Sequence, residues 1–212
     1  MKKKVLVGAF SAMMALALCG GVVATKTVLA DTAKTDAFVM AEGASIRLSD
    51  PSGIRFQTKL GQVQYEALTA QDSKQSLHML IVPEAYYAAY QGYEGDQTIY
   101  EYLSDNYQTL LNLDIPTEKI FQKSDLIEEA QSEYEDGYYY AHGVIQSLHF
   151  NSYANDFVGI AYLKTTDGDT VTYQDAMITT ETPARSAYEV ALRAYDDYED
   201  KTQLQAVIDT AL

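Results

Sequence analysis

The sequence predicts an α+β fold, in which helices pack on an antiparallel β-sheet within a single domain. Residues 44–60 alternate apolar and polar side chains on both sides of a turn sequence, which is typical of a hairpin. Residues 138–173 contain a second series of strand patterns. Helical patterns lie between these two series and after the second, and no internal repeat or long linker divides the chain.

Residues 1–30 show the three parts of a secretory signal peptide in their usual order. Residues 2–4 are lysines, and residues 5–24 form an uncharged stretch of apolar and small side chains. Ala30 then supplies the small side chain that a signal peptidase recognises, and Asp31 begins the polar remainder. We therefore expect cleavage between Ala30 and Asp31.

Two alternatives apply to the same segment. The apolar stretch is about long enough to span a bilayer as an uncleaved anchor, although Gly8, Gly20 and Gly21 favour a cleaved signal. A lipid could be attached to Cys19, but Leu18 before it is larger than the residue that a lipoprotein signal requires. The sequence therefore predicts a secreted or cell-envelope surface protein with no stable membrane anchor after cleavage.

Residues 31–38 are expected to form a flexible leader, and residues 39–212 one extracellular α+β domain. Four of the 15 basic residues and none of the acidic ones lie in residues 1–30. The remainder therefore has 11 basic against 30 acidic residues, a net charge of −19. A surface this acidic repels nucleic-acid phosphates and anionic membranes. We therefore expect no nucleic-acid partner.

The only cysteine, Cys19, lies within the predicted signal. The exported domain can therefore form neither a disulfide nor a thiolate metal site. Its stability has to come from burial of apolar side chains, for which about 180 residues suffice. The chain also has 18 tyrosines and no tryptophan. Tyrosine combines a large apolar face with a polar tip, so it suits half-buried positions and wet binding surfaces alike.

The first expected element is a hairpin of residues 44–49 and 54–60, joined by a turn at residues 50–53. Pro51 presets the first corner of a type I turn, and Gly53 can adopt the left-handed conformation that closes a three-residue loop. This loop length predicts Leu48 opposite Phe56, Ile46 opposite Thr58, and Arg47 opposite Gln57, with Arg55 diagonal to Arg47.

Five elements are expected between the hairpin and the second strand series. They are a short helix at 62–70, a buried strand at 76–82, a helical turn at 83–93, an amphipathic helix at 99–111 and an exposed acidic helix at 124–135. The amphipathic helix is predicted from apolar side chains that share one helical face, and it ends before Pro116.

The second strand series is expected to contain three strands, at 138–150, 157–165 and 170–173, with a tight turn at Asp167-Gly168. Thr182 is a candidate N-cap for a following helix with Pro183 at its first position. A last helix is expected at residues 202–212.

Several of these segments resemble an uncharacterised extracellular domain of Gram-positive Firmicutes surface proteins. The likeness is carried by Gly43-Ala44-Ser45-Ile46-Arg47, by Gly53-Ile54-Arg55-Phe56, by residues 140–145 and 157–163, and by the closing segment Arg185-Ser186-Ala187-Tyr188-Glu189-Val190-Ala191. It spans about residues 40–212. The resemblance implies an extracellular module, and it supplies no catalytic residues that could be assigned to this chain.

Arg47 and Arg55 are the first candidates for a binding site. The predicted register places them diagonally on one sheet face, about 7–8 Å apart, where like charges repel. Either carboxylates neutralise them, and the pair braces the hairpin, or they bind an anion or a sugar hydroxyl, for which the planar guanidinium is suited. Arg185 from the closing helix is a candidate third member.

Tyr138, Tyr139 and Tyr140 are candidates for an exposed aromatic platform. Adjacent side chains on a strand point to opposite faces, so the three rings cannot all face the core. Exposed aromatic rings stack on sugars and anchor protein interfaces. The alternative role of these tyrosines is to fill the core.

No metal site, cofactor or catalytic residue is predicted. His142 and His149 fall at odd spacing in one predicted strand and would point to opposite faces, while His78 lies in an apolar run typical of a hydrogen-bonded core histidine. The acidic segments 167–169 and 196–200 match no calcium-binding loop. No nucleophile motif for acyl transfer is present in the sequence either.

The sequence therefore predicts a secreted or cell-surface, non-catalytic module that binds an extracellular glycan or protein. Its expected ligand contacts are Arg47, Arg55, Tyr138, Tyr139, Tyr140 and Arg185. One alternative is an extracellular hydrolase that works through two carboxylates, which would need a pocket holding an acid with a raised pKa. The other is a purely structural surface component, in which internal carboxylates would neutralise the arginine pair.

Overall fold

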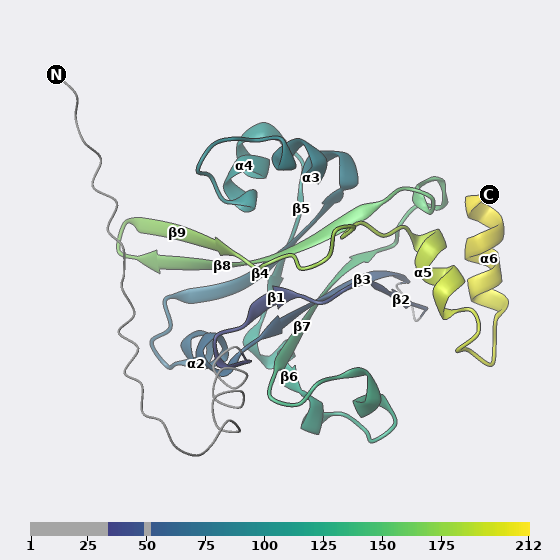
Figure 1. Cartoon of the computed structure of the whole chain (residues 1–212), viewed down its shortest axis with the longest axis horizontal. Coiled ribbons are helices and arrows are strands. Elements are labelled where there is room, and N and C mark those ends of the chain that lie inside the picture. Colours follow the sequence, from purple (N-terminus) through teal and green to yellow (C-terminus); the bar gives the residue numbers. More distant parts are fainter. Residues whose placement is uncertain (1–33, 49–51) are drawn as a thin grey trace, which may run out of the picture.

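The computed structural model describes residues 34–48 and 52–212 (Figure 1). The predicted signal and its cleavage site at Ala30 and Asp31 lie outside the described residues. The chain forms a single α+β domain, as predicted, but it contains two antiparallel sheets rather than one. Within the described ranges, no helix is both long enough and apolar enough to cross a membrane.

The five-stranded sheet is built around the antiparallel pair β3 and β7. Strands β1 and β2 pair with the other edge of β3, and β6 pairs with the beginning of β7. Its strands are β1 (Phe38–Met40), β2 (Ser45–Arg47), β3 (Gly53–Leu60), β6 (Phe121–Gln122) and β7 (Tyr139–Gln146). Burial alternates strictly along β3, so one face of this sheet contacts the core and the other is more exposed.

The four-stranded sheet has the order β5-β4-β8-β9. Its strands are β4 (Gln75–Pro83), β5 (Leu111–Ile115), β8 (Phe157–Asp167) and β9 (Thr170–Asp175). Long stretches of β4 and β8 are continuously buried, because both faces of this sheet are covered. The tight turn predicted at Asp167-Gly168 joins β8 to β9, and Gly168 adopts a φ of 60° there.

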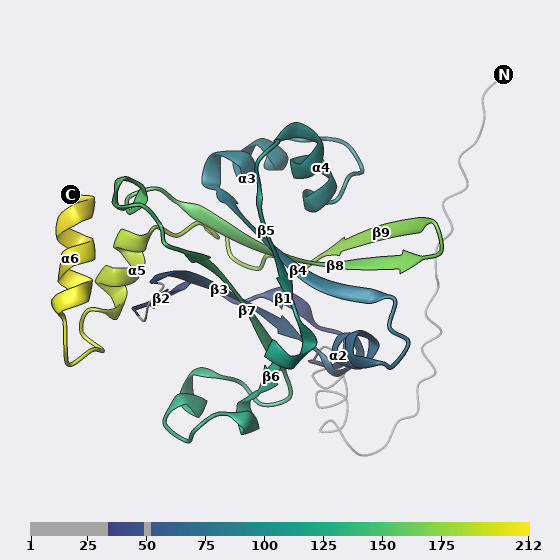
Figure 2. The same ribbon diagram turned by 180° about the vertical axis from the view of Figure 1, so that it is seen from behind.

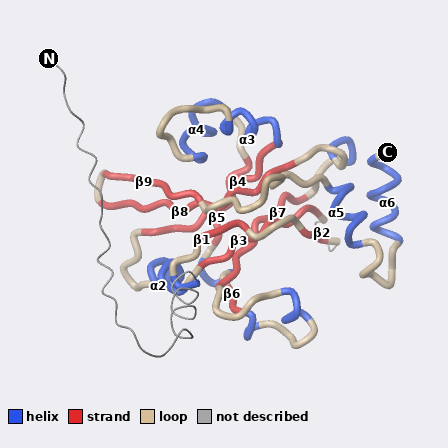
Figure 3. The backbone as a smooth tube through the Cα atoms, viewed as in Figure 1, coloured by secondary structure: helices blue, strands red, loops and turns tan. Residues whose placement is uncertain are grey.

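Helices lie around the periphery of the two sheets, which Figure 3 shows by colour. They are α2 (Gln62–Thr69), α3 (Glu84–Gln91), α4 (Ile99–Asn106), α5 (Ala187–Ala194) and α6 (Thr202–Ala211). Short 3-10 turns are η1 (Thr117–Lys119), η2 (Lys123–Asp125), η3 (Ala130–Glu133) and η4 (Phe150–Ser152). In Figures 1 and 2, α3 and α4 lie on one side of the four-stranded sheet, and the five-stranded sheet lies on its other side.

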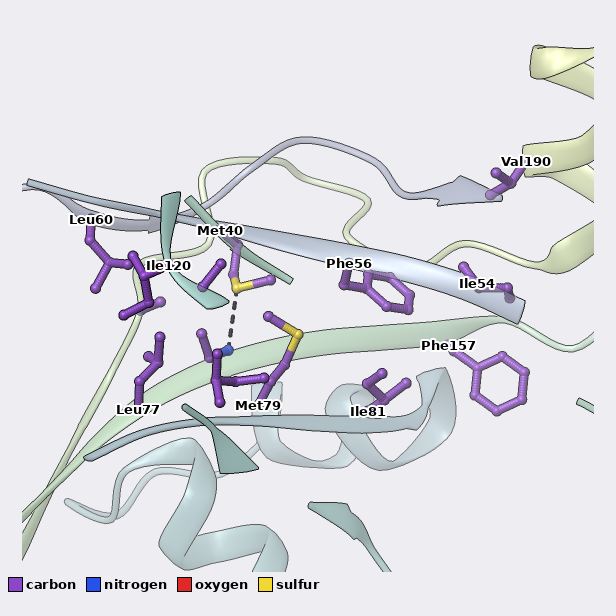
Figure 4. Close-up of a cluster of buried hydrophobic side chains, with 14 of the residues drawn as sticks. Met40, Ile54, Phe56, Leu60, Leu77, Met79, Ile81, Ile120, Phe157 and Val190 are labelled. Atoms are coloured by element: carbon purple, nitrogen blue, oxygen red, sulfur yellow. Dashed lines mark hydrogen bonds between the residues drawn. The ribbon is translucent and has the colours of Figure 1, made fainter. Parts of the chain in front are cut away.

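The main core fills the space between the two sheets (Figure 4). Met40, Ile54, Phe56 and Leu60 from the five-stranded sheet meet Leu77, Met79 and Ile81 from β4. Two glycines permit this close packing. A β-carbon at Gly143 would lie 2.4 Å from the Met79 sulfur, and one at Gly159 would lie 2.4 Å from the Phe56 ring. A larger side chain at either position would require the facing Met79 or Phe56 side chain to move.

A second apolar cluster joins the outer face of the four-stranded sheet to α3 and α4. Its buried members are Leu80, Val82, Ile99, Leu103, Val158, Ile160 and Tyr162. Helix α4 begins with a capping box between Thr98 and Glu101. The Asp175 carboxylate of β9 accepts a further hydrogen bond from the Ile99 backbone N–H. The start of α4 is therefore fixed to the sheet as well as capped locally.

The predicted hairpin forms, but its register was predicted wrongly. Arg47 pairs with Gly53, whereas the three-residue loop placed Gln57 opposite Arg47. The connection runs from residue 48 to 52, which is longer than predicted. The expected pairs Leu48–Phe56 and Ile46–Thr58 are wrong for the same reason. Because the register shift is an even number of residues, every side chain keeps its face, and Arg55 remains diagonal to Arg47.

Two predicted helices were also wrong. The amphipathic helix ends at Asn106, and residues 111–115 form strand β5 instead. Leu110 and Leu111 continue the helical spacing, but pairing with β4 outweighs it, because β4 offers a ladder of backbone hydrogen bonds. Residues 124–135 form only the short turns η2 and η3, since they present few apolar side chains for packing.

The helix predicted to begin at Pro183 begins at Ala187. Ser186 is its N-cap, and its side chain accepts a hydrogen bond from the Glu189 backbone N–H. Thr182 therefore does not cap this helix. The strand predicted at 138–150 ends at Gln146, so His149 lies beyond it.

The leader predicted at residues 31–38 is too long at its C-terminal end. Phe38 is buried and belongs to β1, where it pairs with Leu60. The Gly61 backbone N–H donates to the Ala37 carbonyl at 2.6 Å, and the Lys34 ammonium donates to the Asp136 carbonyl at 3.2 Å. Residues 34–38 are thus part of the packed domain.

Candidate functional site

The exposed face of the five-stranded sheet carries most of the polar residues that could bind a ligand. Cross-strand pairing places Arg55 beside Val144 and Gln57 beside His142 on this face. Ser45 of β2 is the cross-strand partner of Arg55 on its other side. The alternation of β3 and β7 therefore brings together polar side chains that are far apart in the sequence.

A groove of about 690 Å³ lies between this face and strand β5. We call it the β5–β7 groove. One wall is formed by Leu111, Leu113, Asp114 and Ile115 of β5, and the other by Arg55, His142, Val144 and Gln146; Arg47 and Lys119 complete it. Figure 2 shows how β5 runs past β7 on the way to β6. The volume falls within the range of about 300–1,000 Å³ that is usual for ligand pockets.

A smaller pocket of about 120 Å³ adjoins the groove, and Arg55 and His142 line both. Its other walls include Gln57, Tyr134, residues 41–45 and Glu133, so that the carboxylate residues Glu42 and Glu133 line this smaller pocket. Arg55 and His142 therefore stand at the junction of two recesses, where one ligand could contact both side chains.

Arg55 places a positive charge at this junction. Its Nε–H donates to the Ser45 hydroxyl at 2.8 Å. Across residues 34–48 and 52–212, Arg55 forms no ion pair with a carboxylate. This is unusual in a chain of net charge −15. The terminal guanidinium nitrogens suit an incoming carboxylate, phosphate or sulfate, to which they can donate two hydrogen bonds.

His142 stays neutral at physiological pH. Burial, assisted by the positive charge of Arg55, lowers the pKa of His142 from 6.5 to about 4. Its Nε2 is hydrogen-bonded to the Gln57 amide nitrogen at 2.7 Å, and the Phe121 ring contacts it edge-on. A neutral imidazole held in this way presents a polar surface to the groove without adding charge.

Arg47 and Lys119 add further positive charge, and Asp114 is the one carboxylate that lines the groove. On the side of β5 that faces β4, the Asp114 carboxylate lies 3.7 Å from the His78 imidazole. Arg47 and Arg55 lie on the same sheet face, as predicted, and both line the β5–β7 groove. The groove is cationic although the protein is strongly acidic.

The tyrosine triplet does not form an exposed platform. Tyr139 faces the core, where its ring stacks on Tyr65 with centroids 3.6 Å apart. Tyr140 faces the other way but is only 1% exposed, because Phe121 and Tyr134 cover it. The prediction of an exposed aromatic platform is therefore wrong for Tyr139 and Tyr140.

Tyr138 is half-buried and contacts neither recess. The ammonium groups of Lys34 and Lys59 lie 5.7 and 5.6 Å from its ring centroid, within cation–π range. Tyr138 therefore contributes to packing at the end of the sheet rather than to the groove.

Arg185 is not brought into the groove either. It is 9% exposed, and its Nη1 donates to the carbonyl oxygens of Thr182 and Ala184. Its backbone pairs with that of Phe157. Arg185 thus fixes the segment before α5, and the predicted three-arginine cluster is reduced to two.

The carboxylates with raised pKa values lie away from the groove. Burial, with the neighbouring charges of Glu189 and Glu84, raises the pKa of Asp156. Burial also raises the pKa of Asp175, which caps α4. Neither lines either recess. The hydrolase alternative, which requires a paired acid of raised pKa in a pocket, therefore gains no support from the groove.

The other histidines are engaged in local contacts. His78 is hydrogen-bonded to the Ser76 hydroxyl at 2.8 Å and stacks on Tyr162, as expected of a core histidine. His149 accepts a hydrogen bond from the Asn151 backbone N–H. In the part of the chain that the structure describes, no group of three potential ligands among His, Cys, Asp and Glu could hold a metal ion.

The sequence did not predict His142 as a groove residue, and it did not predict strand β5. The alternation of Leu111, Leu113 and Ile115 is a strand signal, but the helical spacing just before it obscured this pattern. His142 would have been placed beside Arg55 if the pairing of β3 with β7 had been predicted. That pairing joins segments far apart in the chain, so local patterns do not reveal it.

The chain matches no protein-family model, and no curated protein matches it. The resemblance of residues 43–56 and of the closing helix to a Firmicutes surface domain therefore stays a prediction.

Proposed function

We propose that this protein is a non-catalytic, secreted or cell-surface module that binds an extracellular glycan or protein in the β5–β7 groove. Arg55 holds an anionic group of the ligand there. The observation that carries the proposal is the placement of Arg55, half-buried at the junction of two recesses with no carboxylate partner in the described ranges.

Charge and shape support this role. A cationic groove on an acidic protein attracts the anionic part of a ligand while the rest of the surface repels it, which favours one orientation. The apolar side chains of β5 line the opposite wall. A ligand with an anionic group and an apolar side therefore complements the groove better than a uniformly polar one.

The purely structural alternative requires internal carboxylates to neutralise both arginines. Arg55 does not meet this requirement, because its hydrogen bond to Ser45 leaves the terminal nitrogens unpaired within the described residues. Burial of an unpaired cation is costly, and a ligand that pairs with it recovers that cost.

Binding screens of residues 31–212 test the proposal, using arrays of acidic oligosaccharides and displayed random peptides. Each ligand found is then titrated against Arg55→Gln. Loss of a charge-assisted hydrogen bond is expected to weaken binding by about tenfold or more. Lys74→Gln is the matched control, because Lys74 pairs with Asp167 at the far end of the β8–β9 hairpin. Equal affinities for Arg55→Gln and the wild type would refute the proposed site.

A further inference from the structure

One edge of β7 has no backbone partner over most of its length. On one side, β7 pairs with β3 along residues 139–146. On the other side, β6 pairs only with Tyr139 and Tyr140. Within the described ranges, no hydrogen bond to the backbone of His142, Val144 or Gln146 completes that second side. This open segment borders the β5–β7 groove, because all three residues line it.

The direction of each backbone group follows from the register. The Ser147 N–H donates to the Ser52 carbonyl at 2.9 Å, one step beyond the β3–β7 ladder. Hydrogen-bonded pairs alternate with non-bonded pairs along an antiparallel ladder. Gly143 and Ile145 therefore point their N–H and C=O groups toward β3. The N–H and C=O groups of His142, Val144 and Gln146 point into the groove.

A strand added to this edge would lie about 4.8 Å from β7, on the side that faces the groove. Leu111 is 37% exposed and Leu113 is half-buried there, so both can contact alternate side chains of the added strand. Arg55 lies on β3, so Val144 of β7 separates it from the added strand. The long side chain of Arg55 can reach an acidic side chain on the face of the added strand that points away from Leu111 and Leu113.

We infer that the ligand of the groove is an extended acidic peptide segment that adds to the open edge of β7 as a further strand. The inference rests on the proposed function and names the class of ligand. The observation that favours a peptide over a glycan is the row of alternating backbone donors and acceptors, which a peptide backbone matches at every second residue. The positive charge of Arg55, Arg47 and Lys119 selects acidic side chains within that peptide.

The free protein allows a first test by amide hydrogen exchange measured by NMR. Val144 and Gln146 are expected to exchange faster than Gly143 and Ile145 by about tenfold or more, because only the latter pair donates to β3. On addition of a selected acidic peptide, the Val144 and Gln146 amides should gain protection. A Val144 amide that is already as protected as Gly143 in the free protein would show that the edge is occupied.

The second test uses proline to block the edge. Val144→Pro removes an N–H that points into the groove and leaves the bonds to β3 in place, so the sheet should tolerate it. It is expected to weaken binding of the selected peptide by about tenfold. Val171→Pro is the matched control. Val171 lies on edge strand β9, and its N–H points away from β8, because the Ala176 N–H donates to Ala161.

Ligand variants keep the test valid if Val144→Pro does not fold. N-methylation of the peptide at successive residues should weaken binding at alternate positions only, since alternate N–H groups face β7. Uniform sensitivity or none would overturn strand addition. Peptide binding that needs Arg55 but ignores these changes would also overturn it, while leaving the proposed function intact. Arg55-dependent binding of acidic oligosaccharides without any binding of peptides would likewise overturn strand addition and leave the proposed function intact. If no ligand depends on Arg55, both proposals fail.

Discussion

The ring of Phe56 packs directly on Gly159, so that a β-carbon at Gly159 would lie 2.4 Å from ring atom Cγ. Met79 and Gly143 form the reciprocal contact, with the bulky side chain on the four-stranded sheet and the glycine on the five-stranded one. The two sheets therefore interlock through one large and one missing side chain on each.

Gly159→Ala should destabilise the domain by about 1–3 kcal/mol, because the methyl group has to displace a buried aromatic ring. Chemical denaturation of the variant and the wild type measures the change. Gly92→Ala is the control, since a β-carbon there would meet only the Ala89 carbonyl at 3.7 Å. If both variants are equally stable, the sheets are packed less closely than the structure shows.

The low pKa of His142 predicts a specific pH dependence. In the unfolded chain this histidine titrates near 6.5, whereas in the fold its pKa is about 4. Between these values the unfolded state binds more protons. The free energy of unfolding therefore falls as the pH drops from about 6.5 to 4, by about 3 kcal/mol from this residue.

His142→Gln isolates that contribution. Glutamine can keep a hydrogen bond to Gln57 but does not titrate. The variant should therefore lose less stability than the wild type between pH 7 and pH 4, as measured by urea denaturation at each pH. Equal losses of stability in the two proteins would mean that the fold does not lower the pKa of His142.

The fold should tolerate removal of the charge of Asp175 but not removal of its hydrogen-bond acceptor. Burial raises the pKa of Asp175, so its contribution to stability falls as the pH rises through that pKa. Asp175→Asn is expected to match or exceed the wild type at pH 7. Asp175→Ala should lose about 1–2 kcal/mol, because the Ile99 N–H loses its acceptor. Thermal unfolding of the two variants side by side decides between these outcomes, and equal destabilisation by both would contradict the expectation.

The start of the helix α5 can be tested with two alanine substitutions. Ser186→Ala should cost about 1 kcal/mol, since its hydroxyl caps the Glu189 N–H. Thr182→Ala should have little effect, because the Thr182 side chain is exposed and does not cap the helix. Guanidinium denaturation of both variants provides the comparison. A larger loss at Thr182 would restore the start predicted from the sequence.

The sequence predicted an element well where its local pattern agrees with the way the element pairs or packs in the fold. The hairpin faces, helix α2, strand β4, the β8–β9 turn and the last helix all rest on strong periodicity or turn residues. The hairpin register was missed because it depends on loop length, which Pro51 and Gly53 alone do not determine. Strand β5 was missed because its partner β4 decides between two local patterns of similar strength.

The candidate site was predictable only in part. Arg47 and Arg55 were found because they are close in sequence on one hairpin. Tyr140 was misjudged because its cover comes from Phe121 of β6 and from Tyr134, which lie outside its own strand. His142 joins the site through pairing with β3, where its partner Gln57 lies 85 residues away in the chain, and such contacts leave no periodic signal.

The two sheets draw their strands alternately from the whole sequence. The five-stranded sheet takes β1 to β3 and then β6 and β7, while the four-stranded sheet takes β4 and β5 and then β8 and β9. Neither half of the polypeptide therefore holds a complete sheet, and a fragment cut between β5 and β6 would leave β3 and β4 without their central partners. Folding of such a topology has to wait until nearly all of the chain has left the ribosome, and its high contact order favours slow folding.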